Sequence, residues 1–224
     1  MGVLPGTRAF EDYDPACEAG RLDCMPWLAR YYWVMRKIAD PVRVGELIDT
    51  LADAIRCDMR GIGGERVGWA IVGIRSRGDD LGRRLAEKIQ IAHVGSLDIT
   101  LYRDVLSEIG PQPVVRTSHI PFPIDGLQIV LVDDVLMSGR SVRAALQSLM
   151  DLGRPRRVWL SVLVDRGGRE LPIRPDHVAL DLSSTEVDRG LGDDERVEVF
   201  LEPTDKRDEI VVVSRATGGA GGLK

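Results

Sequence analysis

The sequence predicts an α/β domain in which a mostly parallel central sheet is covered by helices on both faces. Two short apolar runs, at residues 129–132 (IVLV) and 158–164 (VWLSVLV), are typical of strands buried on both faces. A segment with helical spacing of apolar residues lies between these runs, and such alternation indicates a parallel sheet. The 224 residues are enough for one well-packed domain with an appended segment.

Apolar periodicity predicts three helices in the main domain. The first is amphipathic, with apolar residues at i, i+3, i+4, i+7 and i+8: Val44, Leu47, Ile48, Leu51, Ala52 and Ile55. The second has four apolar residues on its inner face: Leu81, Leu85, Ala86 and Ile89. The third is predicted from about Ser141.

Further strands are predicted between and after these helices. A strand over residues 67–72 precedes the second helix, and alternation over residues 97–101 predicts a strand with one covered face. Residues 103–117 contain charges, Gly110, Pro111 and Pro113, which predict a mobile loop. Shorter strands are expected at residues 177–180, 197–201 and 210–213.

Residues 1–41 differ from the rest and form an aromatic-rich extension. Pro26 suits the first position of a helix, and Pro41 stands just beyond its expected end. The apolar stripe between them would consist of Trp27, Leu28, Tyr31, Met35 and Ile38. We therefore expect a helix docked on the main domain, residues 42–213, or on a neighbouring subunit. The glycine-rich residues 214–224 are predicted to be a flexible tail.

The composition argues against several classes of protein. No apolar run approaches the ~20 residues that a membrane helix needs, and the first residues lack the basic start and apolar stretch of a signal peptide. Three cysteines argue against a disulfide framework, so a cytoplasmic protein is expected. The net charge of −5 disfavours a general nucleic-acid binder. The basic residues 154–157 (RPRR) are interpreted as a solvated turn after a helix.

The most informative segment is residues 129–146, where a buried strand ends in two carboxylates. Asp133 and Asp134 stand at the carboxyl end of the strand, where α/β folds place their ligands. Ser138 and Gly139 then form a tight turn before a helix at Ser141, and such a turn with a helix N-terminus binds anions. The combination suits a phosphorylated sugar, whose hydroxyls the carboxylates would hold directly or through magnesium. Two aspartates that merely end a strand remain the alternative.

A second loop of similar type follows the strand over residues 67–72. Residues 73–78 (GIRSRG) contain two arginines and a serine, which suit a pyrophosphate group. Taken alone, this pattern is weak, and a solvated loop would be the default interpretation. Its position opposite the first turn favours the anion site.

The segment IVLVDDVLMSGRSVRAAL, residues 129–146, resembles the signature with which type I phosphoribosyltransferases bind 5-phosphoribosyl pyrophosphate (PRPP). Segments outside it are similar to the bifunctional pyrimidine operon regulators, which attenuate pyrimidine-gene transcripts and have uracil phosphoribosyltransferase activity. The similarity covers about residues 42–213 and includes DITLYRD (98–104), LVDRGGRELPIR (163–174) and EVFLEPTDKRDEIVVV (198–213). It implies the type I phosphoribosyltransferase fold, with a mostly parallel sheet flanked by helices, a small hood and a flexible loop.

The resemblance also implies UMP synthesis from uracil and PRPP, with magnesium as the cofactor and a homo-dimer or homo-tetramer as the assembly. Asp133 and Asp134 would be catalytic, binding the ribose and, through PRPP or water, the metal. Arg103, the third implied catalytic residue, would close over the site on the flexible loop. The other implied contacts are Met137, Ser138, Gly139, Arg140 and Ser141 for the 5-phosphate, Arg75, Ser76, Arg77 and Gly78 for pyrophosphate, and Val164, Asp165 and Arg166 for the base.

Two departures from the family pattern lie near the implied site. Met137 stands where the regulators usually carry an aromatic residue, and where many 6-oxopurine transferases carry an acid. Because methionine cannot act as that acid, a hypoxanthine or guanine enzyme is disfavoured. Gly168 replaces a histidine that is usual in the regulators.

Other departures disfavour RNA binding. The first amphipathic helix has Asp49, Thr50 and Asp53 where the regulators typically have threonine, arginine and histidine, and Leu180 replaces an expected lysine. Carboxylates repel the phosphates that arginine and histidine attract. The main hypothesis is therefore a uracil phosphoribosyltransferase. The alternative is a regulator that senses UMP or PRPP and binds RNA or a protein partner with little catalysis.

Overall fold

The computed structural model describes residues 32–61, 68–100, 118–183, 191–192 and 194–216. Residues 34–214 form one compact unit. Its elements are β1 (Tyr32–Ala39), α1 (Pro41–Gly61), β2 (Trp69–Ile74), α2 (Arg77–Ile89), β3 (His93–Leu97), β4 (Gln128–Leu136), α3 (Arg140–Leu152), β5 (Arg157–Asp165), β6 (His177–Asp181), β7 (Glu195–Phe200) and β8 (Glu209–Ala216). Within the described ranges, no helix is long and apolar enough to cross a membrane.

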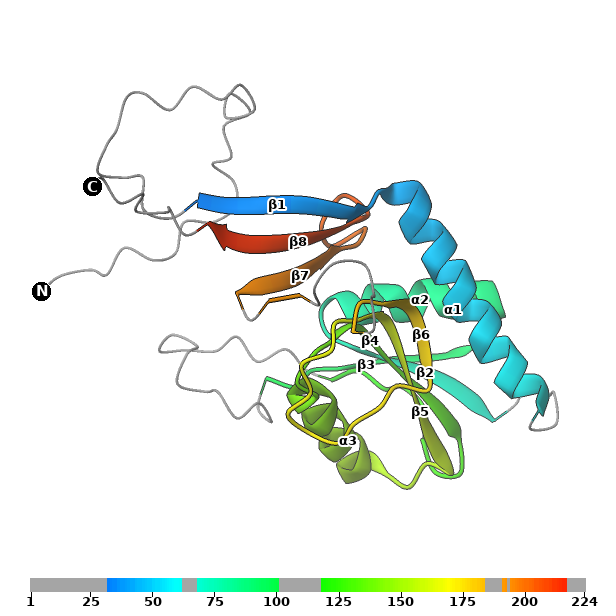
Figure 1. Cartoon of the computed structure of the whole chain (residues 1–224). Coiled ribbons are helices and arrows are strands. Elements are labelled where there is room, and N and C mark those ends of the chain that lie inside the picture. The colour runs from blue at the N-terminus through cyan, green and yellow to red at the C-terminus, as the bar shows by residue number, and fades with distance from the viewer. Residues whose placement is uncertain (1–31, 62–67, 101–117, 184–190, 193, 217–224) are drawn as a thin grey trace, which may run out of the picture. The chain divides into compact units, whose positions relative to one another are not determined.

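The main sheet has five parallel strands in the order β3-β2-β4-β5-β6 (Figure 1). β2 and β4 lie side by side in its centre, with Ala70 opposite Ile129 and Gly73 opposite Val132. The carboxyl ends of these two strands therefore meet at one edge of the sheet. A second, smaller sheet has the order β1-β8-β7, in which β7 and β8 are antiparallel.

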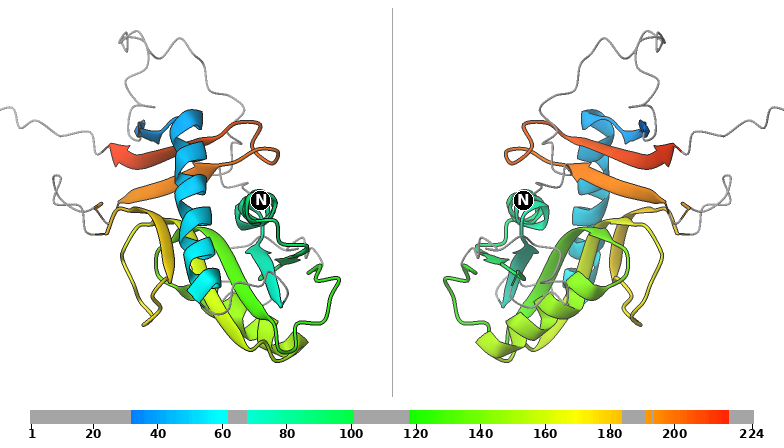
Figure 2. Two further views of the ribbon diagram at one scale, coloured as in Figure 1. Left: turned by 90° about the vertical axis from the view of Figure 1, so that its right-hand side faces the viewer. Right: turned by 90° about the vertical axis from the view of Figure 1, so that its left-hand side faces the viewer.

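Both faces of the main sheet are buried, which explains the unbroken apolar runs in its strands. In β2, Trp69 and Ile71 pack into one core with α1 and α2, whereas Ala70, Val72 and Ile74 pack into a second core with α3. Figures 1 and 2 show α3 on the face opposite α1. Each large apolar side chain buried in this way contributes about 1.5–3 kcal/mol to folding. The predicted α/β architecture is confirmed.

Helix α1 has the predicted apolar face, but it begins at a residue that was expected to follow a helix. Its buried residues include all six predicted positions: Val44, Leu47, Ile48, Leu51, Ala52 and Ile55. Pro41 is its first residue, and Asp40 caps it by accepting the Arg43 N–H at its side chain (2.9 Å) and the Val44 N–H at its carbonyl (2.9 Å). Proline suits this position because the first helical N–H needs no partner within the helix.

The helix predicted before Pro41 is wrong over residues 32–39, which form strand β1. β1 pairs with β8 at the edge of the small sheet, and Lys37 forms an ion pair with Glu209 (2.7 Å). A sheet edge offers unpaired backbone groups, and β-branched residues such as Val34 and Ile38 favour a strand there. Residues 1–31 lie outside the described part of the chain.

Two other boundaries differ from the predictions. The strand expected over residues 97–101 lies earlier, as β3, and ends at Leu97. Asp98 stops it, because its carboxylate accepts the N–H of Thr100 (2.8 Å) and so forms a local turn that competes with the sheet. At the other end, β8 continues to Ala216, so the first residues of the predicted tail belong to a strand.

Candidate active site

One cavity at the carboxyl ends of β2 and β4 is lined by residues of both predicted anion loops: Arg75, Ser76 and Arg77 of one, and Ser141 of the other. We call residues 137–141, after β4, the phosphate loop and residues 75–78, after β2, the pyrophosphate loop. The cavity has a volume of about 350 Å³ and is lined by Ile74, Arg75, Ser76, Arg77, Ile99, Asp133, Asp134, Val135 and Ser141. Sequence segments about sixty residues apart thus form one site because their strands are neighbours in the sheet.

The two carboxylates belong to β4 itself, which extends to Leu136. Asp133 is buried and Asp134 is half-buried. The Asp134 N–H lies 3.1 Å from a carboxylate oxygen of Asp133. Successive side chains of a strand point to opposite faces, yet both residues line the cavity at the strand end. Their oxygens are acceptors of the kind that sugar hydroxyls require.

The phosphate loop turns its carbonyl groups toward the surrounding chain. Arg169 Nη1 donates to the carbonyl of Met137 (2.8 Å), the amides of Glu170 and Leu171 donate to that of Ser138 (both 3.1 Å), and the Arg143 amide donates to that of Gly139 (2.9 Å). In a trans peptide the N–H points opposite to the preceding carbonyl. The amides that follow these carbonyls therefore face the other way, at the N-terminus of α3 where anions bind, although the Arg140 amide already donates to Ser138 Oγ (3.3 Å).

Gly139 makes this turn feasible. Its φ of 88° lies in the left-handed region, which costs a residue with a side chain roughly 1–2 kcal/mol. A Cβ here would also lie 3.3 Å from Ile173 Cδ1. A residue with a side chain is therefore disfavoured at position 139 both by the backbone conformation and by packing against Ile173.

The two glycines of the segment GIRSRG are required by close backbone approach. A Cβ on Gly73 would lie 2.3 Å from the carbonyl oxygen of Gly78, and a Cβ on Gly78 would lie 2.6 Å from that of Val132. The glycines thus let the pyrophosphate loop fold back over β2 and press against β4 next to Asp133. The peptide bond between Arg75 and Ser76 in this loop is cis.

Arg77 of the pyrophosphate loop is held by Asp205, which lies between β7 and β8. Its Nε and Nη2 donate to the two carboxylate oxygens at 2.8 and 3.1 Å. The hydrogen bond to Asp205 raises the pKa of Arg77, and the charge of Asp134 adds to this effect. Burial by itself would raise the pKa of Asp205, but the hydrogen bonds from Arg77 and the Leu201 amide outweigh it, so this pKa is lowered.

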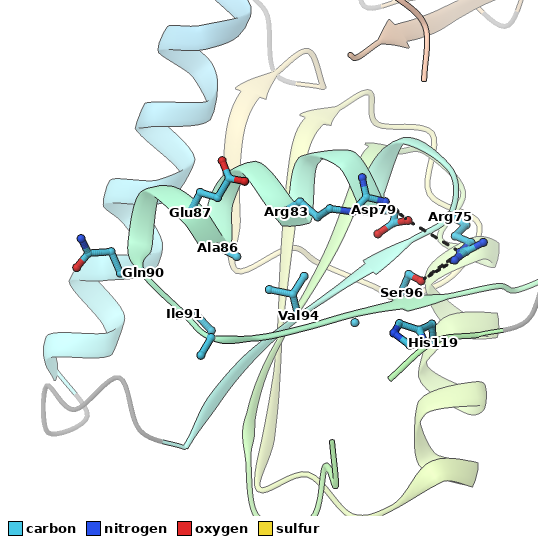
Figure 3. A pocket seen from close by; sticks show the side chains of 12 residues that line it. Arg75, Asp79, Arg83, Ala86, Glu87, Gln90, Ile91, Val94, Ser96 and His119 are labelled. Atoms are coloured by element: carbon cyan, nitrogen blue, oxygen red, sulfur yellow. Dashed lines mark hydrogen bonds and ion pairs between the residues drawn. The ribbon is translucent and has the colours of Figure 1, made fainter. Parts of the chain in front are cut away.

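Arg75 lines two cavities, and its guanidinium is directed to Ser96. Nε and Nη2 donate to Ser96 Oγ at 3.1 and 3.0 Å, and Nε lies 3.9 Å from Asp79 (Figure 3). The second cavity, of about 570 Å³, is larger than the first, is bordered by α2, β3 and His119, and shares only Arg75 with it. We place the chemistry in the smaller cavity, because the paired carboxylates and the phosphate loop meet there.

The segment predicted to contact the base does not line either cavity. The Val164 side chain is fully buried in the core next to the sheet. The Asp165 carboxylate accepts the Gly167 amide (2.9 Å) and Arg169 Nη2 (2.5 Å). Arg166 donates to the carbonyls of Gly192 (3.0 Å) and Glu195 (2.5 Å). The base-binding role of this segment stays a prediction, and Arg103 lies outside the described residues.

The two departures near the site, Met137 and Gly168, turn out to be neighbours. Met137 is 44% exposed, and a Cβ on Gly168 would lie 3.7 Å from its Cγ. Arg169, a half-buried residue, joins the Asp165 carboxylate to the Met137 carbonyl of the phosphate loop. No signal in the sequence pointed to this role.

The donor set fits magnesium bound together with a substrate. Among the described residues, no group of three or more histidine, cysteine or acidic side chains could hold a metal by itself. Asp133 and Asp134 provide two carboxylates beside the loops where phosphate groups would lie. Mg²⁺ is commonly bound by one or two carboxylates with substrate phosphates and water. These two aspartates would hold it, with substrate oxygens completing its coordination.

Comparison with known proteins decides the family. The family model described as phosphoribosyl transferase domain matches residues 39–192. The bifunctional protein PyrR of Thermus aquaticus is 51% identical over 148 residues, which cover 64% of this chain and 78% of that protein. The chain belongs to the phosphoribosyltransferase family and, within it, to the PyrR proteins. The PyrR protein of Thermus thermophilus is 50% identical over 153 residues, covering 66% of this chain and 81% of its own.

Solved phosphoribosyltransferases share the fold at low identity. The hypoxanthine phosphoribosyltransferase of Trypanosoma cruzi has a TM-score of 0.55 at 14% identity, covering 81% of this chain and 97% of its own. The enzyme of Leishmania tarentolae, solved with GMP, has a TM-score of 0.57 at 13% identity, covering 80% and 95%. These likenesses confirm the type I phosphoribosyltransferase fold. The family match begins at residue 39, where β1 ends, so β1 adds a strand from outside the matched domain.

Proposed function

We propose that this PyrR protein transfers the phosphoribosyl group of PRPP to uracil, which yields UMP and pyrophosphate. The observation that carries the proposal is the convergence of Asp133, Asp134, Ser141 and the pyrophosphate loop on one cavity. The identity of about 50% to bifunctional PyrR proteins supports it independently. Met137 disfavours a 6-oxopurine as the base, because a thioether cannot exchange a proton with it.

In this proposal each half of the site binds one end of PRPP. The 5-phosphate occupies the amide cradle of the phosphate loop at the N-terminus of α3. The ribose hydroxyls donate to Asp133 and Asp134, which orient the sugar carbon that will react. The pyrophosphate group binds the loop at residues 75–78, where Arg77 supplies donors and positive charge.

The reaction breaks the bond from the sugar carbon to pyrophosphate, which leaves with the bonding electrons, and forms a bond from that carbon to a ring nitrogen of uracil, whose proton passes to the departing pyrophosphate or to water. Positive charge develops on the sugar as the leaving group departs, and the carboxylates of β4 stabilise it electrostatically. Arg77 offsets negative charge on the leaving pyrophosphate. Magnesium, when bound, supplies further positive charge there. Arg103 remains our proposed residue for closing the site against water.

The test is product formation from PRPP, magnesium and a panel of bases: uracil, orotate, cytosine, hypoxanthine, guanine and adenine. UMP should form from uracil alone. Asp133→Asn/Asp134→Asn should lower turnover by at least about 100-fold, in the range for loss of preorganised charge. The control, Asp49→Asn/Asp53→Asn, removes two carboxylates that are 61% and 74% exposed on α1 and should leave turnover unchanged.

The second candidate is a regulator that senses UMP or PRPP and binds RNA or a protein partner. The word bifunctional in the names of the relatives favours it. Asp49 and Asp53 argue against RNA, because they place exposed carboxylates on α1, where they would repel phosphates. Absence of product from every base, with PRPP or UMP still binding by calorimetry, would favour this candidate. A gel shift with pyrimidine-leader RNA and UMP tests its RNA-binding form.

We further propose a homo-dimer or homo-tetramer located in the cytoplasm. The location is supported by the scarcity of cysteines, of which Cys57 is free and exposed in the described part of the chain. The assembly is supported by family membership. Light scattering of the purified chain measures the assembly directly.

A further inference from the structure

The pyrophosphate loop is tied to the turn between β7 and β8, which lies outside the family match. Asp205 of this turn is 128 residues from Arg77 in sequence, yet its two oxygens accept a fork of two hydrogen bonds from Arg77. The guanidinium of Arg77 also lies 5.6 Å from the ring centre of Phe200. Arg77 therefore has both an acidic partner and an aromatic surface that fix its position.

The two hydrogen bonds to Asp205 occupy one edge of the Arg77 guanidinium and leave the N–H donors of its other edge unused by the described residues. A guanidinium has five N–H donors in a rigid plane. Nε and Nη2 of Arg77 donate to Asp205, and Nη1 has no protein acceptor among the described residues. Because Arg77 lines the cavity with Asp133 and Asp134, its remaining donors are available to an anion bound there.

Asp205 is itself held in place by its turn. Its amide donates to the Leu201 carbonyl (2.9 Å), and the Leu201 amide donates to its Oδ2 (3.0 Å). Its side chain is 14% exposed, compared with 35% for Arg77. The more buried and more strongly bonded partner is therefore the acid, which orients the arginine.

We propose that Asp205 is a positioning residue for pyrophosphate recognition. It accepts two hydrogen bonds from one edge of the Arg77 guanidinium, so that the other edge faces the leaving group of PRPP. The inference rests on the proposed function for the identity of that anion. An arginine with one edge fixed loses less side-chain entropy when it binds pyrophosphate. Asp205 thus acts through Arg77 and does not touch the substrate.

The negative charge of Asp205 has an opposing effect on anion binding. Asp205 carries a negative charge near an anion site, so its removal would favour anion binding through space. That effect is weak at a partly exposed pair, where charges are screened. Loss of the fork costs a positioned, charge-assisted contact and therefore dominates.

A second pair in the same region provides the matched control. Arg84, two helical turns after Arg77 on α2, also forms a two-bond fork, in which its Nη1 and Nη2 donate to the Asp208 carboxylate at 2.7 and 2.8 Å. The Asp208 side chain is 18% exposed, close to the value for Asp205. Neither Arg84 nor Asp208 lines the cavity. Asp208→Asn therefore removes the same charge and the same kind of fork without releasing Arg77.

The experiment compares the full-length wild type, Asp205→Asn and Asp208→Asn. Calorimetry measures binding of pyrophosphate with magnesium, and separately of UMP, which has no pyrophosphate group. Asp205→Asn should weaken pyrophosphate binding about tenfold, the loss of roughly one charge-assisted hydrogen bond, and leave UMP binding unchanged. Asp208→Asn should change neither. In turnover assays, Asp205→Asn should raise the KM for PRPP more than it lowers kcat.

Melting temperatures show whether the variants fold. If Asp205→Asn does not fold, Asp205→Glu replaces it, because glutamate keeps the charge but its longer side chain cannot hold the same fork, and the same selective loss of pyrophosphate affinity is expected. Equal pyrophosphate affinity in Asp205→Asn and Asp208→Asn, or tighter binding in Asp205→Asn, overturns the inference. Wild-type protein that binds PRPP without making UMP overturns the proposed function alone, whereas wild type that binds neither PRPP nor pyrophosphate overturns both.

Discussion

The phosphate loop and the pyrophosphate loop lie in one cavity but are built in different ways. The phosphate loop offers backbone amides, which are aimed by carbonyl contacts to Arg169, Glu170 and Leu171. The pyrophosphate loop offers arginine side chains, which are aimed by Asp205 and Ser96. A backbone cradle depends on conformation, whereas a side-chain cradle depends on partners elsewhere in the chain. Substitutions should therefore act on the two loops by different routes.

The largest effect should come from a single methyl group at the base of the pyrophosphate loop. In Gly78→Ala the new Cβ would meet the Val132 carbonyl at 2.6 Å, and backbone cannot move aside as a side chain does. We expect a loss of more than about 4 kcal/mol in the free energy of unfolding, or no folded protein. Denaturant titration measures it.

The matched control is Gly45→Ala in α1, where a Cβ meets nothing within 4 Å. Alanine stabilises a helix interior by about 1 kcal/mol relative to glycine. A folded, stable Gly78→Ala variant would show that the close approach of the loop to β4 is not required.

In the phosphate loop, Gly139→Ala should have an intermediate effect. The left-handed φ of 88° costs alanine about 1–2 kcal/mol, and Ile173 must shift to accept the Cβ at 3.3 Å. The loop should therefore relax, and UMP, which binds through its 5-phosphate, should bind less tightly while pyrophosphate binds as before. Calorimetry with both ligands measures this, and equal losses for the two would contradict separate cradles.

The Arg77–Asp205 and Arg84–Asp208 pairs should make the stability of the fold depend on pH. For Asp208, burial would raise the pKa, but the hydrogen bonds from Arg84 and the Glu202 amide outweigh it and lower the pKa, as Arg77 does for Asp205. A carboxyl with a lowered pKa stabilises the fold above its unfolded value of about 3.9, and this stabilisation is lost as the pH falls through the folded value. The wild type should therefore melt above Asp205→Asn/Asp208→Asn at pH 7, and the difference should shrink below about pH 4.

The control for this pH series is Asp53→Asn. The Asp53 carboxylate is 74% exposed and pairs with Arg56 on the surface of α1. An exposed pair of this kind contributes little to stability. The melting temperature of this variant should equal that of the wild type at every pH. If the melting temperatures of the wild type and of Asp205→Asn/Asp208→Asn differ by the same amount at every pH, the assignment is refuted.

The smallest effect is expected at Met137, whose contribution to the phosphate loop is its backbone. Met137→Leu keeps the carbonyl that Arg169 contacts and replaces a side chain that is 44% exposed. The KM for PRPP should change less than about threefold, as for a surface substitution of similar volume. A tenfold change would indicate that this side chain contacts the substrate.

Much of the fold followed from local pattern. The runs that became β4 and β5 were predicted because strands buried on both faces are apolar at successive positions, and α1 was predicted because a helix buries one face with its own period. The pairing of Asp133 with Asp134 and the glycines of both loops were likewise visible along the chain. β1 was predicted as a helix because its apolar spacing fitted that period, whereas its β-branched residues and the free edge of β8 favour the strand.

Asp205 was not predicted as part of the site, although the segment DKRDE that contains it was noted. Its partner, Arg77, is distant in sequence, and nothing in either local pattern specifies their contact. The family resemblance implied Arg166 as a base contact, which stays a prediction, and the structure shows its guanidinium donating to the carbonyls of Gly192 and of Glu195, the first residue of β7. Side-chain partners across elements depend on how the elements pack.

By itself, the sequence determined the helices and most strands of the main sheet, but not β1, and it predicted the two anion loops, because these depend on periodicity, turn conformation and short-range chemistry. The tertiary structure decided that β2 and β4 are neighbours, that both loops face one cavity, and that Asp205 aims Arg77. These are long-range contacts, and their geometry is fixed only when the two apolar cores pack on the faces of the sheet.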